Sequence, residues 1–276
     1  MDRTSAKQYV HGVVHAFVPS NARKYKFGYI NPLDPAQNAF GFFIDPKPIE
    51  GTVVAFDDLL LVKTGRIDFI GVPASILRGD ELPQVGDKVQ VVTYARRKFD
   101  GRRLDEPEVE IRTMPDGTQY EVKTMVIGAG HLDFPLETKP TCPELAEMIR
   151  QMTLLPAPGS DCGYRRIVHM IADAGGKDFR LVDPVPEKII ETPPELSFHV
   201  STAMFQGRVA VRYDRGSDTY EVHAGSDHAG RDPIRIEDVH FIELGEVFER
   251  IFDDGSWAYV TVNITKRARR PRAKAH

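Results

Sequence analysis

KYKFGYI at residues 24–30 and AFGFFI at residues 39–44 are the two stretches that decide the predicted fold. Successive side chains of a strand alternate between its two faces, so the two Tyr and the Phe of the first stretch would share one face. The connection at residues 31–38 is rich in Pro and Asn, which favour turns. We therefore expect the two stretches to pair as a β-hairpin with their aromatic rings side by side.

Such an aromatic platform has more than one interpretation. Flat rings beside cations such as Lys26 can stack on unpaired bases while the cations hold phosphates, and each stacked base contributes about 1–3 kcal/mol. The same rings can instead form the core of a small β-barrel or an interface for another protein. The residue pattern alone leaves these alternatives open.

Three short segments share a further pattern: GVVHAF at 12–17, KFGYI at 26–30 and FGFF at 40–43. Together they resemble the opening strands of the cold-shock domain, an OB-fold barrel that binds single strands. The resemblance covers about residues 9–45 and, more loosely, a strand at 84–95. It implies an OB-like barrel whose base-stacking positions are occupied by Phe27, Tyr29, Phe40, Phe42 and Phe43. Where the family has Trp, Gly and His, this chain has Ala16, Lys26 and Phe42.

The segments that follow continue the β-rich pattern. Apolar runs rich in strand formers predict strands at 51–56, 59–62, 66–71 and 84–94. Relative to a simple cold-shock barrel, residues 46–83 would contain an insertion. Two further strands are predicted at 108–111 and 119–127, joined by a Pro-Asp-Gly turn. We expect residues 1–130 to form one OB-like domain.

A basic loop, ARRKFDGRR at residues 95–103, follows the predicted strand at 84–94. Cations around one aromatic ring suit the rim of a nucleic-acid site, and the alternative is a solvated charged turn. The candidate phosphate contacts in this loop are Arg96, Arg97, Lys98 and Arg102.

Past residue 140 the pattern becomes helical. Leu145, Met148 and Met152 recur at helical spacing, and a second periodic segment follows them. Together they predict a helical hairpin over residues 140–182. A Pro-rich, acidic linker is expected at residues 183–195.

The last folded segment is expected at residues 196–265, as a small α+β domain of ββαβ order. It would contain a hairpin, a helix capped by Asp238 and a closing strand at 257–264. VRYD at 211–214 and DTYEV at 218–222, together with that helix, resemble the small accessory domains of polyvalent proteins from plasmids and phages. This resemblance implies a mobile-element origin.

Charge is distributed unevenly along the 276 residues. The formal net charge of -4 disfavours nonspecific coating of duplex DNA, because that mode of binding requires many neutralised phosphates. Residues 266–276 form a basic tail with six cations and no acid, which leaves a net charge of about -10 on the rest of the chain. The tail is either a phosphate-binding arm or a solvated terminus. Its candidate contacts are Lys266, Arg267, Arg269 and Arg270.

Several function classes are disfavoured by what the sequence lacks. Two cysteines provide no disulfide framework and favour a reducing compartment, and no apolar run has the length of a membrane span or a signal core. We therefore expect a cytoplasmic protein. No Ser-His-Asp or paired-carboxylate pattern is recognisable, and the His and Asp residues at 223–232 match no metal-ligand spacing. We expect neither a cofactor nor a metal.

These observations predict an α+β protein that binds single-stranded RNA or DNA without catalysing a reaction. The aromatic platform would stack bases, and the basic loop and tail would hold phosphates. The alternative is a protein-binding adaptor or inhibitor encoded by a mobile element, which would use the aromatic face as a protein interface.

Overall fold

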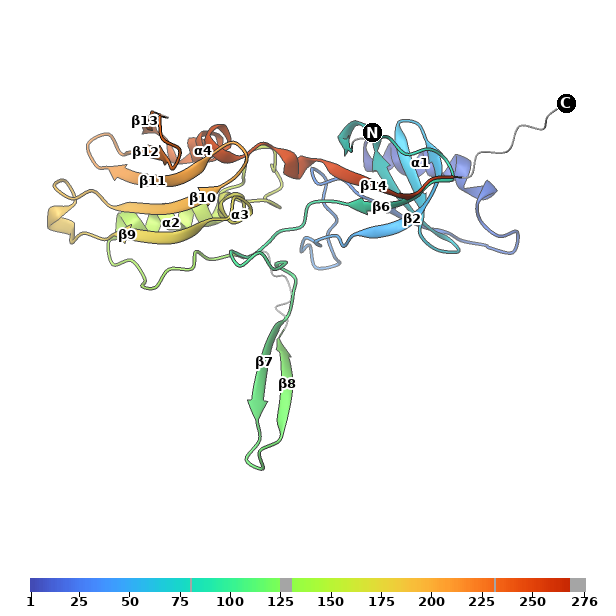
Figure 1. The fold of residues 1–276 in the computed structure, drawn as a ribbon, viewed down its shortest axis with the longest axis horizontal. Coiled ribbons are helices and arrows are strands. Elements are labelled where there is room, and N and C mark those ends of the chain that lie inside the picture. The colour runs from blue at the N-terminus through green and yellow to red at the C-terminus, as the bar shows by residue number, and fades with distance from the viewer. Residues whose placement is uncertain (80, 125–130, 231, 269–276) are drawn as a thin grey trace. The chain divides into compact units, whose positions relative to one another are not determined.

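The chain folds as two compact units in the computed structural model, which describes residues 1–79, 81–124, 131–230 and 232–268. Unit 1 comprises Met1–Ala95 and Ser256–His276, and unit 2 comprises Arg96–Gly255. Figure 1 shows that each unit combines a β-sheet with helices. In the part of the chain that the structure describes, none of the sheets closes into a barrel, and no helix is both long and apolar enough to cross a membrane.

Unit 1 is built on a seven-stranded sheet with the order β1-β4-β3-β2-β6-β14-β5. Its strands are β1 (Lys26–Tyr29), β2 (Ile49–Phe56), β3 (Leu59–Lys63), β4 (Asp68–Pro73), β5 (Leu77–Arg78), β6 (Lys88–Val92) and β14 (Val260–Lys266). The strands predicted at 51–56, 59–62, 66–71 and 84–94 are confirmed as β2, β3, β4 and β6, although β4 begins and ends two residues later than expected and β6 is shorter.

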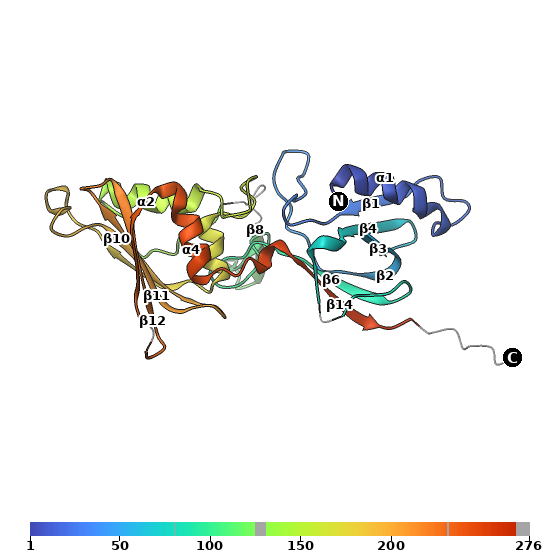
Figure 2. The ribbon, with the colours of Figure 1, turned by 90° about the horizontal axis from the view of Figure 1, so that it is seen from above.

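The interior strand β3 is buried on both faces. Leu59 and Leu61 face one hydrophobic cluster, and Leu60 and Val62 face a second cluster on the other side. A strand covered on both sides needs apolar residues at every position, which explains the continuous run LLLV. The first cluster includes Ala6 and Val10 of α1 (Arg3–Val13), and Figure 2 shows this helix lying over β1, β4 and β3.

The N-terminal segment is helical, so the strand predicted at 12–17 is wrong. The Asp2 side chain caps α1 by accepting the backbone N–H of Ser5 at 2.8 Å. Ala6, Val10 and Val14 are fully buried at a spacing of four residues, which is the period of a helix and not of a strand. GVVHAF therefore ends a helix and does not open a barrel.

The hairpin predicted from the two aromatic stretches is also not formed. β1 pairs with β4 in parallel, with Lys26 opposite Asp68 and Tyr29 opposite Gly71. Residues 39–44 form no strand, and only an isolated bridge joins Gln37 to Phe43. The physical reason is local competition, because an Asn side chain in this loop takes backbone N–H groups that a strand ladder would need.

Unit 2 is built on a five-stranded antiparallel sheet with the order β13-β12-β11-β10-β9. Its strands are β9 (Lys177–Val182), β10 (Glu195–Ser201), β11 (Gln206–Asp214), β12 (Thr219–Ser226) and β13 (Ile234–Val239). Its helices are α2 (Pro143–Leu154), α3 (Ile167–Asp173) and α4 (Leu244–Phe252). Single 3-10 turns lie at Pro186–Lys188 and Phe241–Glu243 in this unit, and at Val14–Ala16, Ala74–Ile76 and Ser256–Ala258 in unit 1.

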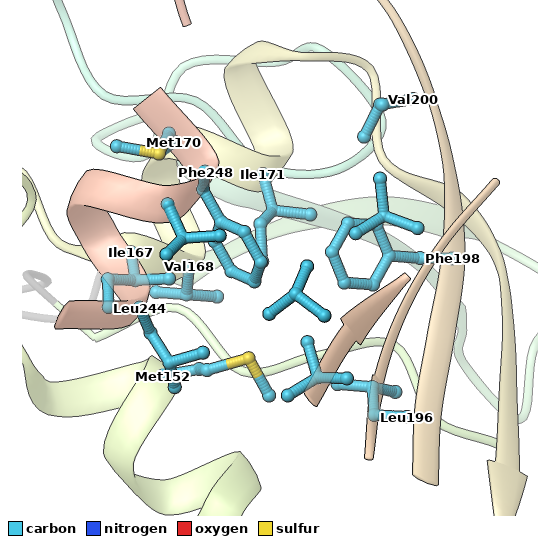
Figure 3. Close-up of a cluster of buried hydrophobic side chains, with 14 of the residues drawn as sticks. Met152, Ile167, Val168, Met170, Ile171, Leu196, Phe198, Val200, Leu244 and Phe248 are labelled. Carbon is cyan, nitrogen blue, oxygen red and sulfur yellow. The ribbon is translucent and has the colours of Figure 1, made fainter. Parts of the chain in front are cut away.

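The helices of unit 2 share one hydrophobic core with the sheet (Figures 2 and 3). Phe198 of β10 meets Phe248 of α4 edge to face, with ring centroids 6.0 Å apart. Met152 of α2 and Ile171 of α3 are buried in the same cluster. The two helices predicted as a separate hairpin over residues 140–182 are therefore α2 and α3, which belong to this larger α+β unit.

A third sheet consists only of β7 (Glu108–Thr113) and β8 (Gln119–Thr124). The predicted strand pair is confirmed, and the three-residue turn between the strands has Gly117 at φ +87°. We call β7, β8 and their turn the ribbon. It belongs to unit 2 and not to an N-terminal barrel.

The domain boundaries differ from those expected. The segment at 183–195 is not an interdomain linker, because β9 and β10 on either side of it pair within one sheet, with Val182 opposite Glu195. The ββαβ order is also different, because the predicted closing strand, β14, lies in the sheet of unit 1 beside β6. Asp238 lies in β13, and the helix expected after it begins at Leu244.

Candidate nucleic-acid interface

A groove of about 470 Å³ lies between α1 and β1 in unit 1. Its lining comprises two cations of α1, three aromatic rings at β1, and two small residues: Arg3, Lys7, Tyr25, Phe27, Tyr29, Gly28 and Ala36. Rings and cations thus meet in one concavity, which is the chemistry that single-stranded nucleic acids require.

Two elementary periodicities produce this lining. Arg3 and Lys7 are four residues apart, so they lie one turn apart on the same face of α1. Tyr25, Phe27 and Tyr29 alternate with residues that face the other way, so they share one side of β1. β1 is the edge strand of the sheet, and α1 lies over this side.

The three rings differ in how much they are available to a ligand. Tyr29 is 8% exposed, and its hydroxyl donates to the backbone oxygen of Met1 at 2.6 Å. Burial raises the pKa of Tyr29. Tyr25 and Phe27 are half-buried, so part of each ring is open to solvent. Tyr29 therefore holds the floor of the groove in place, whereas Tyr25 and Phe27 can contact a ligand.

Phe27 is positioned by a glycine on the neighbouring strand. A Cβ atom on Gly71 would lie 2.9 Å from Cε2 of Phe27, which is closer than real Cβ atoms approach. The absence of a side chain at Gly71 lets the ring lie against the backbone of β4. The inner part of Phe27 thus packs against the core beneath α1 while the remainder stays exposed.

The cations at the groove are only partly neutralised. Arg3 donates to the carboxylate of Asp34 at 3.1 Å, and its guanidinium carbon lies 5.4 Å from the centroid of the Tyr29 ring. Lys26 lies next to the groove but faces the other side of β1; its side chain is 81% exposed and approaches Asp68 only to 3.9 Å. Within the described ranges, Lys7 forms no ion pair. Residues 1–30 contain five cations and a single acid, Asp2.

Phe40, Phe42 and Phe43 lie outside the groove, on a separate loop of unit 1. The loop is ordered by Asn38, whose side-chain oxygen accepts the N–H groups of Phe40 and Phe42 at 2.9 and 3.1 Å. Phe40 is 78% exposed and Phe42 41% exposed, whereas Phe43 is half-buried. The structure therefore does not bring these rings together with Phe27 and Tyr29 on one strand pair.

The basic loop at 95–103 is not the predicted row of phosphate contacts. Arg96 is 2% exposed, with its guanidinium carbon 4.8 Å from the centroid of the Tyr164 ring. Lys98 and Arg102 both form ion pairs with Glu108. Arg97 is exposed, and it donates to the backbone oxygen of Gly101 at 2.9 Å. The tight turn thus brings Arg96 into the core and Lys98 and Arg102 against an acid, whereas Arg97 remains exposed.

The basic tail begins with a cation that is also held by the fold. Arg267 forms ion pairs with Glu81 and, at 3.0 Å, with Asp87, which is only 1% exposed. Lys266 lies opposite Lys88 at the end of β14. Arg269 and Arg270 lie outside the described residues. Arg267 is therefore a structural contact of unit 1 and not a free phosphate ligand.

Arg3 and Lys7 are the groove-lining residues that sequence reasoning missed. Their signal was present, because Asp2 is a helix-capping residue and the apolar residues after it recur at helical spacing. Across the described part of the chain, no three His, Cys, Asp or Glu side chains are grouped so as to hold a metal ion. Comparison with models of known protein families, with curated proteins and with solved structures finds no match for this chain.

Proposed function

We propose that the protein binds single-stranded RNA or DNA in the groove between α1 and β1, and that it does so without catalysing a reaction. Tyr25 and Phe27 stack on bases and Lys7 holds a phosphate in the groove, while Lys26, on the other face of the edge strand β1, holds a phosphate beside it. The observation that carries this proposal is that the half-exposed rings of Tyr25 and Phe27 share one groove with Lys7, which forms no ion pair among the described residues. The thiols of Cys142 and Cys162 are free, in keeping with action in the cytosol.

A single strand fits this groove better than a duplex does. Stacking on a side chain requires an unpaired base, whose flat face is inaccessible inside a double helix. The volume of about 470 Å³ accommodates a short stretch of nucleotides and no extended tract. Few phosphates would be neutralised, so we expect a logarithmic salt slope of about -1.4 for the two contacts of Lys7 and Lys26 to a single strand.

The test is a titration of fluorescent poly-dT and poly-rU 15-mers with the full-length protein and with the variants Phe27→Leu and Tyr25→Leu. Leucine keeps an apolar side chain at the core beneath α1 but removes the aromatic face. We expect each variant to bind more weakly by about 1–3 kcal/mol. Thermal unfolding of each variant verifies that the fold is retained. Unchanged affinity in a folded variant would contradict the proposal.

A second candidate function, binding of a protein partner, is favoured by the loop at 31–45. Its exposed apolar side chains are Leu33, Phe40, Phe42 and Ile44. The loop contains two acids and no cation, so it lacks the charge that phosphates require. Phe40→Ala with Phe42→Ala separates the two functions. If this double variant loses nucleic-acid binding while Phe27→Leu binds as the parent does, the nucleic-acid site lies on the loop and not in the groove.

A further inference from the structure

The ribbon exposes nearly all of its side chains. Every residue of β7 and β8 is exposed except Val122, which is half-buried. Among the exposed residues are Ile111 at 66% and Tyr120 at 40%. A two-stranded hairpin is marginally stable by itself in water, and its two outer edges present unpaired N–H and C=O groups. Addition of further strands would remedy both defects.

The hydrogen-bond pattern of the ribbon determines which peptide groups face outward. Met114 donates its N–H to the backbone oxygen of Thr118 at 2.8 Å, next to the turn. Hydrogen-bonded and non-hydrogen-bonded pairs alternate along an antiparallel ladder. The peptide groups of Tyr120 and Val122 therefore point toward β7, and those of Glu121 and Lys123 point away from it, along the free edge of β8.

This free edge is complementary to itself. Its centre reads Glu121-Val122-Lys123, an acid and a base on either side of an aliphatic residue. In an antiparallel pair related by a two-fold axis at Val122, each Glu121 lies opposite Lys123 of the second copy, and the two Val122 side chains meet. Opposite charges at facing positions stabilise a strand pair.

The neighbouring registers are disfavoured. A two-fold axis at Glu121 places two carboxylates face to face, and an axis at Lys123 does the same with two ammonium groups, which is destabilising. A shift of one residue places inward-pointing peptide groups of one copy opposite outward-pointing groups of the other, so the ladder loses its hydrogen bonds. The axis at Val122 satisfies both requirements.

The edge of β7 has a similar pattern, Glu110-Ile111-Arg112, but its charges are already engaged. Arg112 donates to Glu110 at 2.8 and 3.0 Å, and Glu108 is bound by Lys98 and Arg102. On β8, the nitrogen of Lys123 is 3.6 Å from Glu121, and both side chains are more than 60% exposed. The Glu121–Lys123 pair on the β8 edge can therefore be replaced by ion pairs with another chain.

We propose that a second copy of this chain docks against the ribbon, β8 to β8, about a two-fold axis at Val122. The product is a four-stranded antiparallel sheet with the order β7-β8-β8-β7. Two intermolecular Glu121–Lys123 pairs flank its centre, and Tyr120 of each copy lies opposite Thr124 of the other. This inference stands independently of the nucleic-acid proposal, because it uses no residue of the groove.

A charge exchange on the full-length protein tests the register. Glu121→Lys and Lys123→Glu each replace two attractive pairs by two repulsive ones, so we expect each to weaken dimerisation about tenfold or more in sedimentation equilibrium. The double variant, E121K with K123E, restores opposite charges and should dimerise as the parent does. A parent that stays monomeric, or a double variant that is not restored, overturns the proposal.

Disulfide trapping distinguishes the two edges. In a Cys162→Ser background, Val122→Cys places the two new thiols opposite one another at a Cα separation that a disulfide can span, and we expect rapid cross-linking under mild oxidation. Cys142 is buried and does not interfere. Ile111→Cys on the β7 edge is the matched control and should remain uncrosslinked. Cross-linking through residue 111 and not through residue 122 overturns the assignment to β8.

Discussion

Two stretches of this chain combine cations with aromatic residues in the same way, at residues 23–29 and 96–103, yet they fold into opposite environments. In the first, the rings line a groove, and Lys26 approaches an acid only to 3.9 Å. In the second, Phe99 packs against Phe134 with centroids 5.8 Å apart. There the cations are buried, paired with acids or bound to a carbonyl oxygen.

The difference shows what a basic run in a sequence does and does not indicate. A cation is available to a phosphate only when the fold leaves it without an acid, because an ion pair already formed must be broken before a ligand is bound. The acids that engage the second stretch include Glu108, which lies at the start of another strand. The composition of the loop carries no information about such a neighbour.

The largest effect that can sharpen this comparison is expected at Arg165 of unit 2. Its side chain is 2% exposed and contacts Asp173 at 2.9 Å and Asp253 at 2.5 Å. Arg165→Ala leaves two largely buried carboxylates without their common partner, so we expect a loss of about 3–5 kcal/mol in the free energy of unfolding. Urea denaturation measures this loss.

The matched control is Arg23→Ala, which removes an exposed cation of unit 1 and should leave the unfolding free energy unchanged within error. If Arg165→Ala lowers the free energy of unfolding as little as Arg23→Ala does, Arg165 does not stabilise unit 2, and the contrast between the two units is contradicted.

A smaller effect is expected from the pH dependence of unit 2. His169 is fully buried, and its Nδ1 accepts the backbone N–H of Arg166 at 3.0 Å. Burial, reinforced by the nearby charge of Arg96, holds the pKa of His169 well below its usual range. The folded state thus keeps this imidazole neutral, whereas the unfolded chain protonates it below a pH of about 6.5.

Because the unfolded state binds one more proton than the folded state, the free energy of unfolding falls as the pH drops below about 6.5. Above this pH the contribution of His169 is constant. The slope below it is at most about 1.4 kcal/mol per pH unit, the value for one proton. His169→Gln removes this contribution. Urea denaturation between pH 7 and pH 5 should therefore give a shallower dependence for the variant. Identical slopes for parent and variant would show that His169 does not titrate on unfolding in this range.

The smallest effect concerns the salt dependence of nucleic-acid binding. Lys24→Ala with Lys26→Ala removes two exposed cations beside the groove, so the logarithmic salt slope should become shallower by about 0.7 per lost phosphate contact. Lys98→Ala with Arg102→Ala removes the same number of charges from the other stretch and should leave the slope unchanged. Titrations at several salt concentrations measure both slopes, and equal changes would erase the distinction between the stretches.

The local sequence was sufficient to predict those helices, strands and turns whose formation depends only on residues close together in the chain. The apolar runs of β2 and β3, the Pro-Asp-Gly turn of the ribbon and the helical period of Leu145, Met148 and Met152 each predicted the element that is observed. The alternating side-chain directions of residues 25–29 also placed the rings of Phe27 and Tyr29 on one face of the strand. These features depend on backbone geometry within a few residues, which the sequence states directly.

Only the tertiary structure decided which elements meet. β14 was predicted as a strand, but its partner β6 lies about 170 residues earlier, and the alternation of a strand does not name its neighbour. Arg267 was predicted to be a free cation, yet the pairing of β14 brings it to the buried carboxylate of Asp87. In the same way, the groove needed α1 to lie over β1 before Lys7 could face Phe27. Sequence determined the faces of the elements, and long-range packing determined which charges remain available, because burial and pairing are properties of neighbours in space.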